Sequence, residues 1–264
     1  MKPIALTIAG SDPSGGAGIQ ADLKTFHQFG CYGMSVITLL TVQNTRGVGA
    51  VRPLEPDFVV AQLDNLLIDL PPRAAKTGAL GTAEIVEAID GKAADFAFPL
   101  VVDPVMISKH GASLIDGEGA EAIRKRLLPR AFLVTPNLPE AVQLAGREID
   151  DSGSMREAAR AIAALGPRAV LIKGGHLKGA SADDLLFFEG KFQEFTGRRL
   201  DTRNTHGTGC TYSAAITAGL ASGKELKEAI AVAKRYITRA IATNPGLGHG
   251  FGPVNHHADR TGPE

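Results

Sequence analysis

Short apolar runs alternate along the chain with stretches whose apolar residues recur every three or four positions. Bounded by glycine or proline, the runs predict strands at residues 4–9, 34–42, 100–103, 132–135 and 169–173. Helices are predicted between them at residues 18–29, 57–70, 83–90, 119–127, 139–145 and 154–165. Because the strand segments are continuously apolar, we expect them to be buried on both faces of a mainly parallel sheet built from βαβ units.

The pattern changes in the last third of the chain. Residues 184–188 and 191–195 predict two strands joined at Glu189-Gly190, which favours a tight hairpin turn. Alanine-rich helices are predicted at 211–222 and 225–243, and the polar segment 250–264 is expected to pack loosely. The sequence shows no repeat or linker, so we predict a single domain over residues 1–264.

Composition narrows the class of protein. The 264 residues include 28 Lys and Arg and 28 Asp and Glu, so the formal net charge is zero, which argues against a partner such as nucleic acid or an anionic membrane. The apolar run at the N-terminus is too short for a secretory or transmembrane segment. Cys31 and Cys210 lie far apart in sequence, so we expect no disulfide framework and a cytoplasmic location.

A glycine-rich segment at residues 10–18 follows the first predicted strand and precedes a predicted helix. A P-loop would need Lys and then Ser or Thr after its second glycine, but Gly15 is followed by Gly16-Ala17. Residues 16–21 match the dinucleotide pattern G-x-G-x-x-A, yet the second strand ends without the acidic residue that this motif needs. Both nucleotide-binding motifs are therefore disfavoured.

Two interpretations of this segment stay open. Its glycines can let the backbone approach a flat ring whose polar edge meets Asp12 or Asp22, or they can form a tight turn with Asp12 capping the helix. Gln43 ends the second apolar strand, and its amide can pair with an aminopyrimidine or pyridine edge. Taken alone, Gln43 is more typical of an ordinary strand end.

The segment 204–210, Asn-Thr-His-Gly-Thr-Gly-Cys, directly precedes a predicted helix. Gly207 and Gly209 allow successive N–H groups to point into one concavity, and a helix N-terminus favours negative charge, so the segment predicts a phosphate-binding anion hole. Cys210 falls in the first helical turn, where thiol pKa values drop below their usual value of about 8.5, so it is a candidate base. From local context alone, Cys210 is more typical of a small buried cysteine.

At this point the chain resembles a known family. Gly207-Thr208-Gly209-Cys210 is similar to the anion-hole signature of the ribokinase superfamily, in which the last position is usually Asp. Cysteine there is typical of the hydroxymethylpyrimidine and phosphomethylpyrimidine kinases of thiamin biosynthesis. The likeness extends through residues 9–25, 43–45, 103–106, 135–141 and 173–176 and spans about residues 4 to 255. It implies a ribokinase-like three-layer α/β/α fold with a mainly parallel central sheet.

The resemblance also implies roles for individual residues. The substrate ring would be bound by Gln43 with Gly10, Asp12 and Asp22; the ATP phosphates by Lys173, Thr205, Thr208 and Asn137; and Mg²⁺, directly or through water, by Asp103 and Glu140. Cys210 would act as the base, with Gly207, Thr208 and Gly209 stabilising the transferred group. His206 is expected only to shape the loop, and His110, His249, His256 and His257 to lie at the surface.

The function implied is ATP-dependent phosphorylation of 4-amino-5-hydroxymethyl-2-methylpyrimidine and then of its monophosphate, in a homodimer. A pyridoxal or pyridoxine kinase of the same fold is the nearest alternative, since both substrates are flat nitrogenous rings bearing a hydroxymethyl group. A non-catalytic pyrimidine-binding protein is a third reading, and the filled polar positions from Gln43 to Cys210 argue against it.

Overall fold

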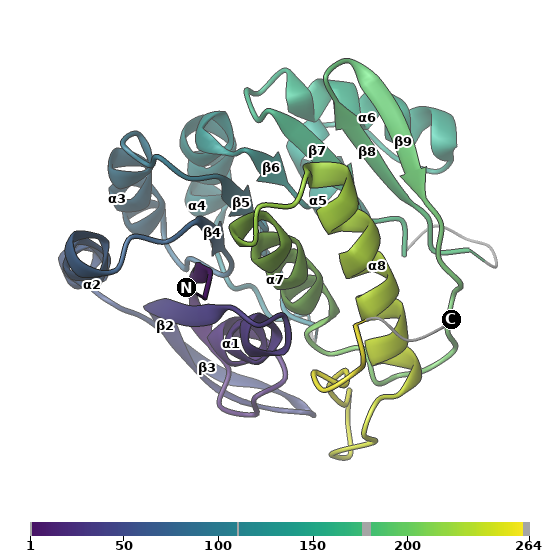
Figure 1. Ribbon diagram of the computed structural model, residues 1–264, viewed down its shortest axis with the longest axis horizontal. Coiled ribbons are helices and arrows are strands. Elements are labelled where there is room, and N and C mark those ends of the chain that lie inside the picture. Colours follow the sequence, from purple (N-terminus) through teal and green to yellow (C-terminus); the bar gives the residue numbers. More distant parts are fainter. Residues whose placement is uncertain (1, 110, 176–180, 261–264) are drawn as a thin grey trace.

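The computed structural model describes residues 2–109, 111–175 and 181–260, and its centre is one nine-stranded sheet covered by helices (Figure 1). His110 and His176 lie outside the described residues. The strands are β1 (Ile4–Ser11), β2 (Tyr32–Asn44), β3 (Gly47–Pro53), β4 (Ala74–Thr77), β5 (Leu100–Val102), β6 (Leu133–Val134), β7 (Ala169–Ile172), β8 (Asp184–Phe188) and β9 (Lys191–Phe195). The helices are α1 (Gly18–Gln28), α2 (Pro56–Asp69), α3 (Ala83–Ala93), α4 (Gly117–Ala122), α5 (Leu138–Ala145), α6 (Ser152–Ala163), α7 (Thr208–Ala221) and α8 (Leu226–Ala242), with a π-helical turn at Ile123–Leu127 and a 3₁₀ turn at Leu128–Arg130.

The strand order in the sheet is β3-β2-β1-β4-β5-β6-β7-β8-β9. Six neighbouring strands are parallel, in the order β2-β1-β4-β5-β6-β7. At the two ends of this group, β3 and β8 pair antiparallel with β2 and β7. The chain moves from β1 outward to β2 and then returns to the other side of β1 as β4, so the order reverses between β1 and β4. Open α/β sheets bind ligands at the carboxyl ends of the strands beside such a reversal.

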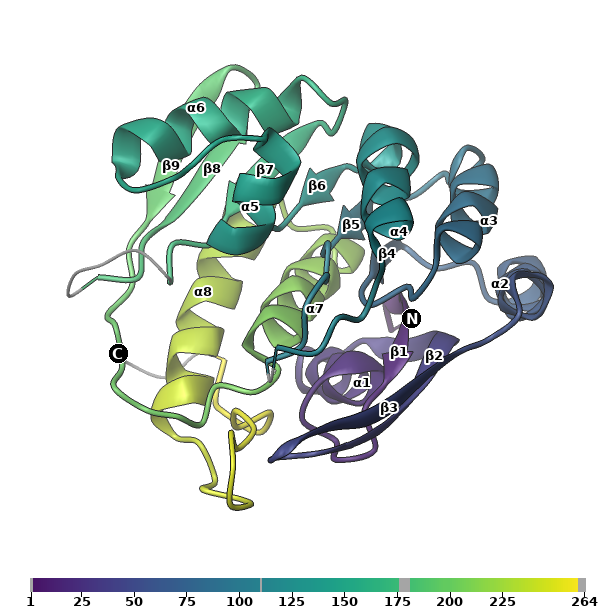
Figure 2. The same ribbon diagram turned by 180° about the vertical axis from the view of Figure 1, so that it is seen from behind.

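Two helical layers cover the sheet, which confirms the predicted α/β/α arrangement. Leu6 and Ile8 of β1 face a core formed with α2 to α6, whereas Ala5 faces a second core formed with α1, α7 and α8. Figure 2 shows α3 to α6 on the near side, and the opposite view shows α1, α7 and α8. No helix in the described ranges is long and apolar enough to cross a membrane.

Helix α7 lies deep in the molecule because small residues meet on both sides of its contact with the sheet. Ala5 and Ala74 on the strands lie in the same core as Ala214 and Ala218, and ten of the 14 residues of α7 are buried. A helix that is apolar all round is typical of such a central position. Its N-terminus is therefore held among the strand ends in the middle of the fold.

Two strands were missed and one was wrongly described. β4 has only four residues, one of them Lys76, and β3 is short, glycine-containing and mostly exposed, so neither forms an apolar run. The prediction that residues 34–42 are buried on both faces is wrong, because the side chains at the end of β2 are not covered and the strand pairs only with β3 after Leu40. Leu40 and Val42 are 45% and 68% exposed there.

The expectation of a loose C-terminal segment is also wrong as far as residue 260. Phe251 N–H donates to the Thr45 carbonyl at 2.8 Å, and His206 N–H donates to the Gly252 carbonyl at 3.0 Å. Val254 is buried, and so is His256, which was expected at the surface. This segment therefore packs directly against the predicted anion hole.

Candidate functional site

The two glycine-rich segments are in direct backbone contact. Gly207 has a left-handed φ of 79°, and a Cβ atom added to it would lie 1.8 Å from the Gly16 carbonyl oxygen. Only glycine fits such a position without moving the neighbouring backbone. The loop after β1 and the loop before α7, almost 200 residues apart in sequence, thus form one surface at the switch point.

The start of α7 has the character of an anion-binding site. Gly207 is the N-cap residue, and no side chain caps the helix. The first N–H groups of a helix have no partner within the helix, and they attract negative charge. Thr208 is fixed at this point because its hydroxyl donates to the Thr205 carbonyl at 2.7 Å. The geometry therefore supports the anion hole predicted from Gly207 and Gly209.

Lys173 and Asp103 lie beside this helix start. A Cβ atom added to Gly209 would be 3.3 Å from Lys173 Nζ and 3.7 Å from Asp103 Oδ2. Lys173 Nζ donates to Asp103 Oδ1 at 2.9 Å, and Thr135 and Ser213 donate to the two carboxylate oxygens, each at 3.1 Å. Although burial alone would raise the pKa of Asp103, the neighbouring lysines hold that pKa below its usual value. Lys173 thus places a fixed positive charge at the anion hole.

Asn137 and Glu140 form a capping box at the start of α5. Asn137 Oδ1 accepts from Glu140 N–H at 2.9 Å, and Glu140 Oε2 accepts from Asn137 N–H at 2.8 Å. Burial, opposed by Lys173 and reinforced by Asp103, raises the pKa of Glu140 to about 7. Both residues therefore have a structural role in this conformation, whatever they do with a nucleotide.

The site residues fit Mg²⁺ only as an ion held mainly by other ligands. Within the described ranges, no group of three or more His, Cys, Asp or Glu side chains is arranged to hold a metal. The two oxygens of Asp103 already accept hydrogen bonds, and Glu140 Oε2 is used in its capping box. Mg²⁺ usually keeps several waters and binds substrate phosphates, so these carboxylates suit contacts through water.

Asp12 and His206 connect the two glycine-rich loops. Asp12 Oδ1 accepts from the Ser14 N–H and hydroxyl, and Oδ2 accepts from the Ala17 N–H and lies 2.8 Å from His206 Nε2. Despite burial, which acts in the opposite direction, the hydrogen bonds from His206 and Ser14 lower the pKa of Asp12. Gln43 Nε2 is 3.3 Å from His206 Nε2, so Gln43 joins this cluster. Asp12 therefore stabilises the turn, but the interpretation that it caps the helix is wrong, because Ala17 is the N-cap residue of α1 and no side chain caps this helix. His206 does more than shape its own loop.

Asp22 and Gly10 are both buried below the glycine-rich loops. Asp22 is fully buried, and its Oδ2 accepts from Thr7 Oγ1 at 2.6 Å and Lys76 Nζ at 2.8 Å. A Cβ atom on Gly10 would be 2.5 Å from Leu39 Cδ1, so the missing side chain makes room for Leu39. Asp22 has no exposed surface with which to touch a substrate ring in this conformation.

Cys210 lies in the first turn of α7, as predicted, but its pKa does not move in the expected direction. Burial raises the pKa of the thiol to about 12; Lys76 acts to lower it, and Asp22 and Asp103 act to raise it further. Lys76 is therefore a charged neighbour of the predicted base that sequence reasoning missed. Its only sequence signal is a lysine between apolar residues in a segment too short to be recognised as a strand.

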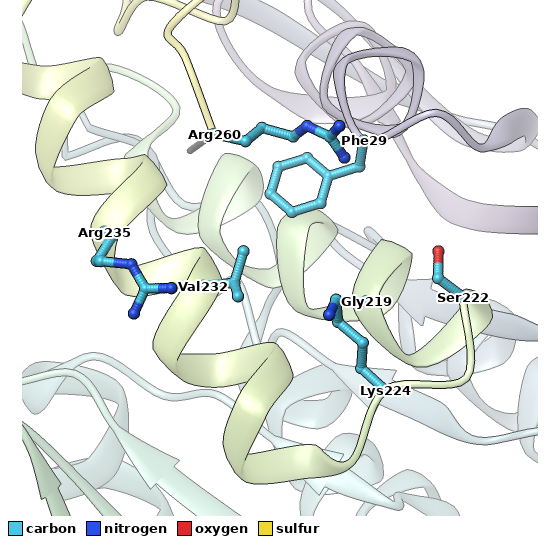
Figure 3. Close-up of a pocket in the computed structure, with 7 residues that line it drawn as sticks. All are labelled: Phe29, Gly219, Ser222, Lys224, Val232, Arg235 and Arg260. Atoms are coloured by element: carbon cyan, nitrogen blue, oxygen red, sulfur yellow. The ribbon is translucent and has the colours of Figure 1, made fainter. Parts of the chain in front are cut away.

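A separate cavity of about 300 Å³ lies at the other end of α7, near the end of α1 (Figure 3). Its lining residues are Phe29, Gly219, Ser222, Lys224, Val232, Arg235 and Arg260. Arg260 lies over the Phe29 ring at 5.4 Å from its centroid, and Lys224 pairs with Glu228. None of the predicted site residues lines this cavity, so it is distinct from the anion hole.

Comparison with known proteins decides the family. Residues 12–255 match the family described as phosphomethylpyrimidine kinase. The chain belongs to the phosphomethylpyrimidine kinase family. A thiamine biosynthesis bifunctional protein of Geobacter sulfurreducens is 53% identical over 252 residues, which cover 95% of this chain but 51% of that protein, so the chain spans about half of its length. The hydroxymethylpyrimidine/phosphomethylpyrimidine kinase of Streptomyces coelicolor is 48% identical over 254 residues, covering 96% of this chain and 94% of that kinase.

A solved structure gives the same result for the fold. The ADP complex of Bacillus subtilis pyridoxal kinase superposes with a TM-score of 0.90 at 42% identity, covering 98% of both chains. The ribokinase-like fold and the family resemblance predicted from the sequence are therefore confirmed. Membership of the phosphomethylpyrimidine kinase family makes the chain an ATP-dependent kinase. The positions of Cys210 and Lys173 can therefore be compared with what phosphoryl transfer needs.

Proposed function

We propose that this chain phosphorylates 4-amino-5-hydroxymethyl-2-methylpyrimidine with ATP and then phosphorylates the monophosphate, for thiamin biosynthesis. One structural observation carries the proposal: the uncapped start of α7 holds Gly209, the residue before Cys210, next to the Lys173–Asp103 pair. This arrangement combines an anion hole, a fixed cation and a proton acceptor. The Streptomyces kinase is 48% identical over 96% of this chain, which supports the choice of substrate.

In the proposed reaction, the substrate hydroxymethyl oxygen attacks the γ-phosphorus of ATP while its proton passes to Cys210. N–H groups at Gly207, Thr208 and Gly209 stabilise the charge that spreads over the transferred group. Lys173, with the hydroxyl of Thr205 and Asn137 beside it, binds the triphosphate. Bound Mg²⁺ would offset phosphate charge, with Asp103 and Glu140 contacting it through water.

At the other end of the site, the ring would lie against the Asp12–His206–Gln43 cluster. The Gln43 amide offers both a donor and an acceptor, which suits an aminopyrimidine edge. Asp12 orients His206 and the glycine-rich turn, Gly10 makes room for Leu39 behind that turn, and Asp22 binds Thr7 of β1. The binding role of Gly10 and Asp22 is thereby proposed as indirect.

Pyridoxal kinase activity is the second candidate, because the B. subtilis pyridoxal kinase matches this chain over nearly its whole length. A coupled ADP-release assay should compare kcat/KM for the hydroxymethylpyrimidine, its monophosphate and pyridoxal. We expect the two pyrimidines to be used at least about tenfold better than pyridoxal. A preference for pyridoxal would reverse the assignment, and no ATP turnover with any of the three would remove it.

The proposal also includes a location in the cell and an oligomeric state. Cys31 and Cys210 are both free thiols, which supports a cytoplasmic location. The apolar face at the end of β2, with Leu40 and Val42 exposed, supports a homodimer that covers it. Both statements belong to the proposal and are tested separately from the kinase reaction.

A further inference from the structure

The side-chain amide of Gln43, near the end of β2, lies between Thr41 and His206. In one of its two orientations, Gln43 Nε2 is 3.3 Å from His206 Nε2 and Gln43 Oε1 is 3.2 Å from Thr41 Oγ1. The nitrogen and oxygen of an amide have almost the same size, so their hydrogen-bond partners decide between this orientation and the reverse one. The partners on the two sides of Gln43 therefore determine how its amide is oriented.

His206 Nε2 carries a proton, because its neighbour at 2.8 Å is Asp12 Oδ2. Asp12 also accepts from the Ser14 N–H at 2.9 Å, the Ser14 hydroxyl at 2.7 Å and the Ala17 N–H at 2.9 Å. A group with so many donors around it is an ionised carboxylate, which only accepts, so His206 Nε2 is the donor to Asp12. A protonated ring nitrogen has no lone pair in the ring plane, so it cannot accept from the NH₂ group of Gln43.

The Thr41 hydroxyl gives the same result on the other side of the amide. Its single proton is donated to the Ser11 carbonyl at 3.0 Å, so towards Gln43 this hydroxyl can only accept. With the amide reversed, Gln43 Nε2 donates to Thr41 Oγ1, and Gln43 Oε1 accepts a share of the His206 N–H. The reversed orientation gives each donor an acceptor, whereas the first one places two N–H donors next to each other.

The His206 ring is held firmly enough to fix this amide. Its side chain is 4% exposed, and a Cβ atom added to Gly16 would be 2.5 Å from His206 Cδ2. The His206 N–H donates to the Gly252 carbonyl at 3.0 Å, and the Val254 N–H donates to the His206 carbonyl at 3.2 Å. Gln43, in contrast, is only partly buried on the part of β2 that pairs with β3 alone, where a long side chain would otherwise keep its rotational freedom.

We propose that His206 is a positioning residue that fixes Gln43 with its amide oxygen towards His206 and thereby selects the aminopyrimidine ring. The proposal rests on the kinase reaction proposed above and adds the residue that controls its substrate choice. His206 and Thr41 use one lone pair and one N–H of the amide, which leaves one of each for the ring. On 4-amino-5-hydroxymethyl-2-methylpyrimidine, the amino donor lies next to the N3 acceptor, so Gln43 Oε1 accepts from the amino group and Nε2 donates to N3.

A ring with an acceptor in place of the amino group meets the fixed amide oxygen and is disfavoured. The formyl group of pyridoxal, next to the carbon that bears its hydroxymethyl group, is such an acceptor. An amide that could turn would donate to this group and lose the distinction. Fixing Gln43 through His206 therefore converts a side chain that suits both rings into one that suits the aminopyrimidine.

The test uses a substrate analogue that reverses both hydrogen bonds. 5-Hydroxymethyl-2-methylpyrimidin-4-one has nearly the same shape, but its C4 oxygen accepts and its N3–H donates. In the ADP-release assay, the parent should prefer the amino compound by at least about 100-fold in kcat/KM. His206→Phe keeps a ring without the N–H donor, so this preference should fall below about tenfold, mainly through a higher KM, with kcat changed less than about threefold. His206→Gln, whose Nε2 reaches the same position, should restore most of the preference.

Three further measurements separate this role from support of the turn. Ser14→Ala removes the hydroxyl donor from the other oxygen of Asp12 without touching Gln43, so the preference should stay at the parental value. Thr41→Val removes the partner of Gln43 on the opposite side and should lower the preference as His206→Phe does. In the substrate-free protein, the ¹⁵N order parameter of the Gln43 amide should fall below about 0.6 in His206→Phe, as in flexible segments.

A folded His206→Phe protein with the parental preference would overturn the proposal, and so would a parent that uses both pyrimidines equally or an equal loss of preference in Ser14→Ala. Circular dichroism verifies folding; if His206→Phe does not fold, a parental preference in Thr41→Val decides against the proposal. The kinase assignment is judged separately. A parent that phosphorylates neither pyrimidine rejects that assignment, and an unchanged order parameter of Gln43 in His206→Phe then rejects the positioning role as well.

Discussion

At Cys210, two physical effects act in opposite directions on the same thiol. The helix start favours the thiolate, whereas burial favours the neutral form and raises the pKa to about 12. The charge of Lys76 already contributes to this pKa, so a base in this position works only if the bound substrates change the balance. Sequence position identified the residue but could not give the sign of its pKa shift, because burial depends on the whole fold.

Cys210→Ala tests the base role. We expect kcat to fall by at least about 100-fold, because a positioned base contributes rate enhancements of that order, while ATP binding stays within about twofold. Turnover is measured by ADP release and nucleotide binding by calorimetry. Cys31→Ala, at the buried thiol far from the anion hole, is the control and should keep most of its activity. Near-parental kcat in Cys210→Ala would reject the assignment.

Gly207→Ala tests the contact between the two glycine-rich loops. Both Gly207 and Gly223 have φ near +80°, but a Cβ atom on Gly207 would strike the Gly16 carbonyl, whereas nothing lies within 4 Å of one on Gly223. Gly223→Ala should therefore cost only the left-handed strain of about 1 kcal/mol. Gly207→Ala should cost at least about 2 kcal/mol more in urea unfolding and should weaken ATP binding. Equal losses in the two variants would contradict the contact.

Some site residues could be predicted from the sequence and others could not. Gly207 and Gly209 follow from local chemistry, because glycines directly before a helix start favour an anion hole, whereas the base role of Cys210 came only from the family resemblance. Asp12 and His206 are 194 positions apart, and only folding brings their side chains to 2.8 Å. Lys76 was missed for the same reason, since its partner Asp22 lies on another element.

At the scale of elements, the C-terminal segment supports the anion-hole loop and carries a buried histidine. Burial, with nearby positive charges, lowers the pKa of His256 from 6.5 to about 4. Between pH 6.5 and 4 the unfolded chain binds a proton at this residue and the folded chain does not, so folding stability falls as pH falls through this window. The loss can reach about 3 kcal/mol at pH 4.

His256→Gln isolates this contribution. Relative to the parent, the variant should lose less stability between pH 7.5 and 4.5, measured as the urea free energy of unfolding at each pH. The comparison with the parent is needed because Glu140, with its pKa raised to about 7, acts in the opposite direction: its stabilising contribution is lost as pH rises from 4.5 to 7. His249→Gln, at an exposed position, should follow the parental pH profile. If His256→Gln does so too, the buried neutral histidine is excluded.

Long apolar and amphipathic segments predicted most elements to within a few residues, and the β8–β9 hairpin with its turn at Glu189-Gly190 was placed correctly. β4 and β3 were missed because four residues with a lysine, or seven with two glycines, carry too little hydrophobic periodicity. The lysine, which is fully buried, hid β4 from the sequence pattern. Local rules fail here at a charged site inside the core.

At the scale of the whole molecule, the sheet reversal between β1 and β4 explains why the site lies where it does. The loop after β1, the end of β4 and the start of α7 meet at this point. Asp103 and Lys173 come from the ends of strands farther along the sheet. The groups proposed to bind the phosphates therefore lie on the β5–β7 side, and those proposed to bind the ring lie on the β1–β2 side.

The extended end of β2 makes a prediction about assembly. At the end of β2, past the register shift opposite Ala9 and Ser11, Leu40 and Val42 form an apolar face and are 45% and 68% exposed. A second copy would bury this face, so Val42→Lys should convert a dimer to a monomer in sedimentation velocity at micromolar concentration. Ile68→Lys, at an 87% exposed position on α2, is the matched control and should stay dimeric. A parent that sediments as a monomer contradicts the proposed homodimer; dimers in both variants would mean that another surface forms the interface.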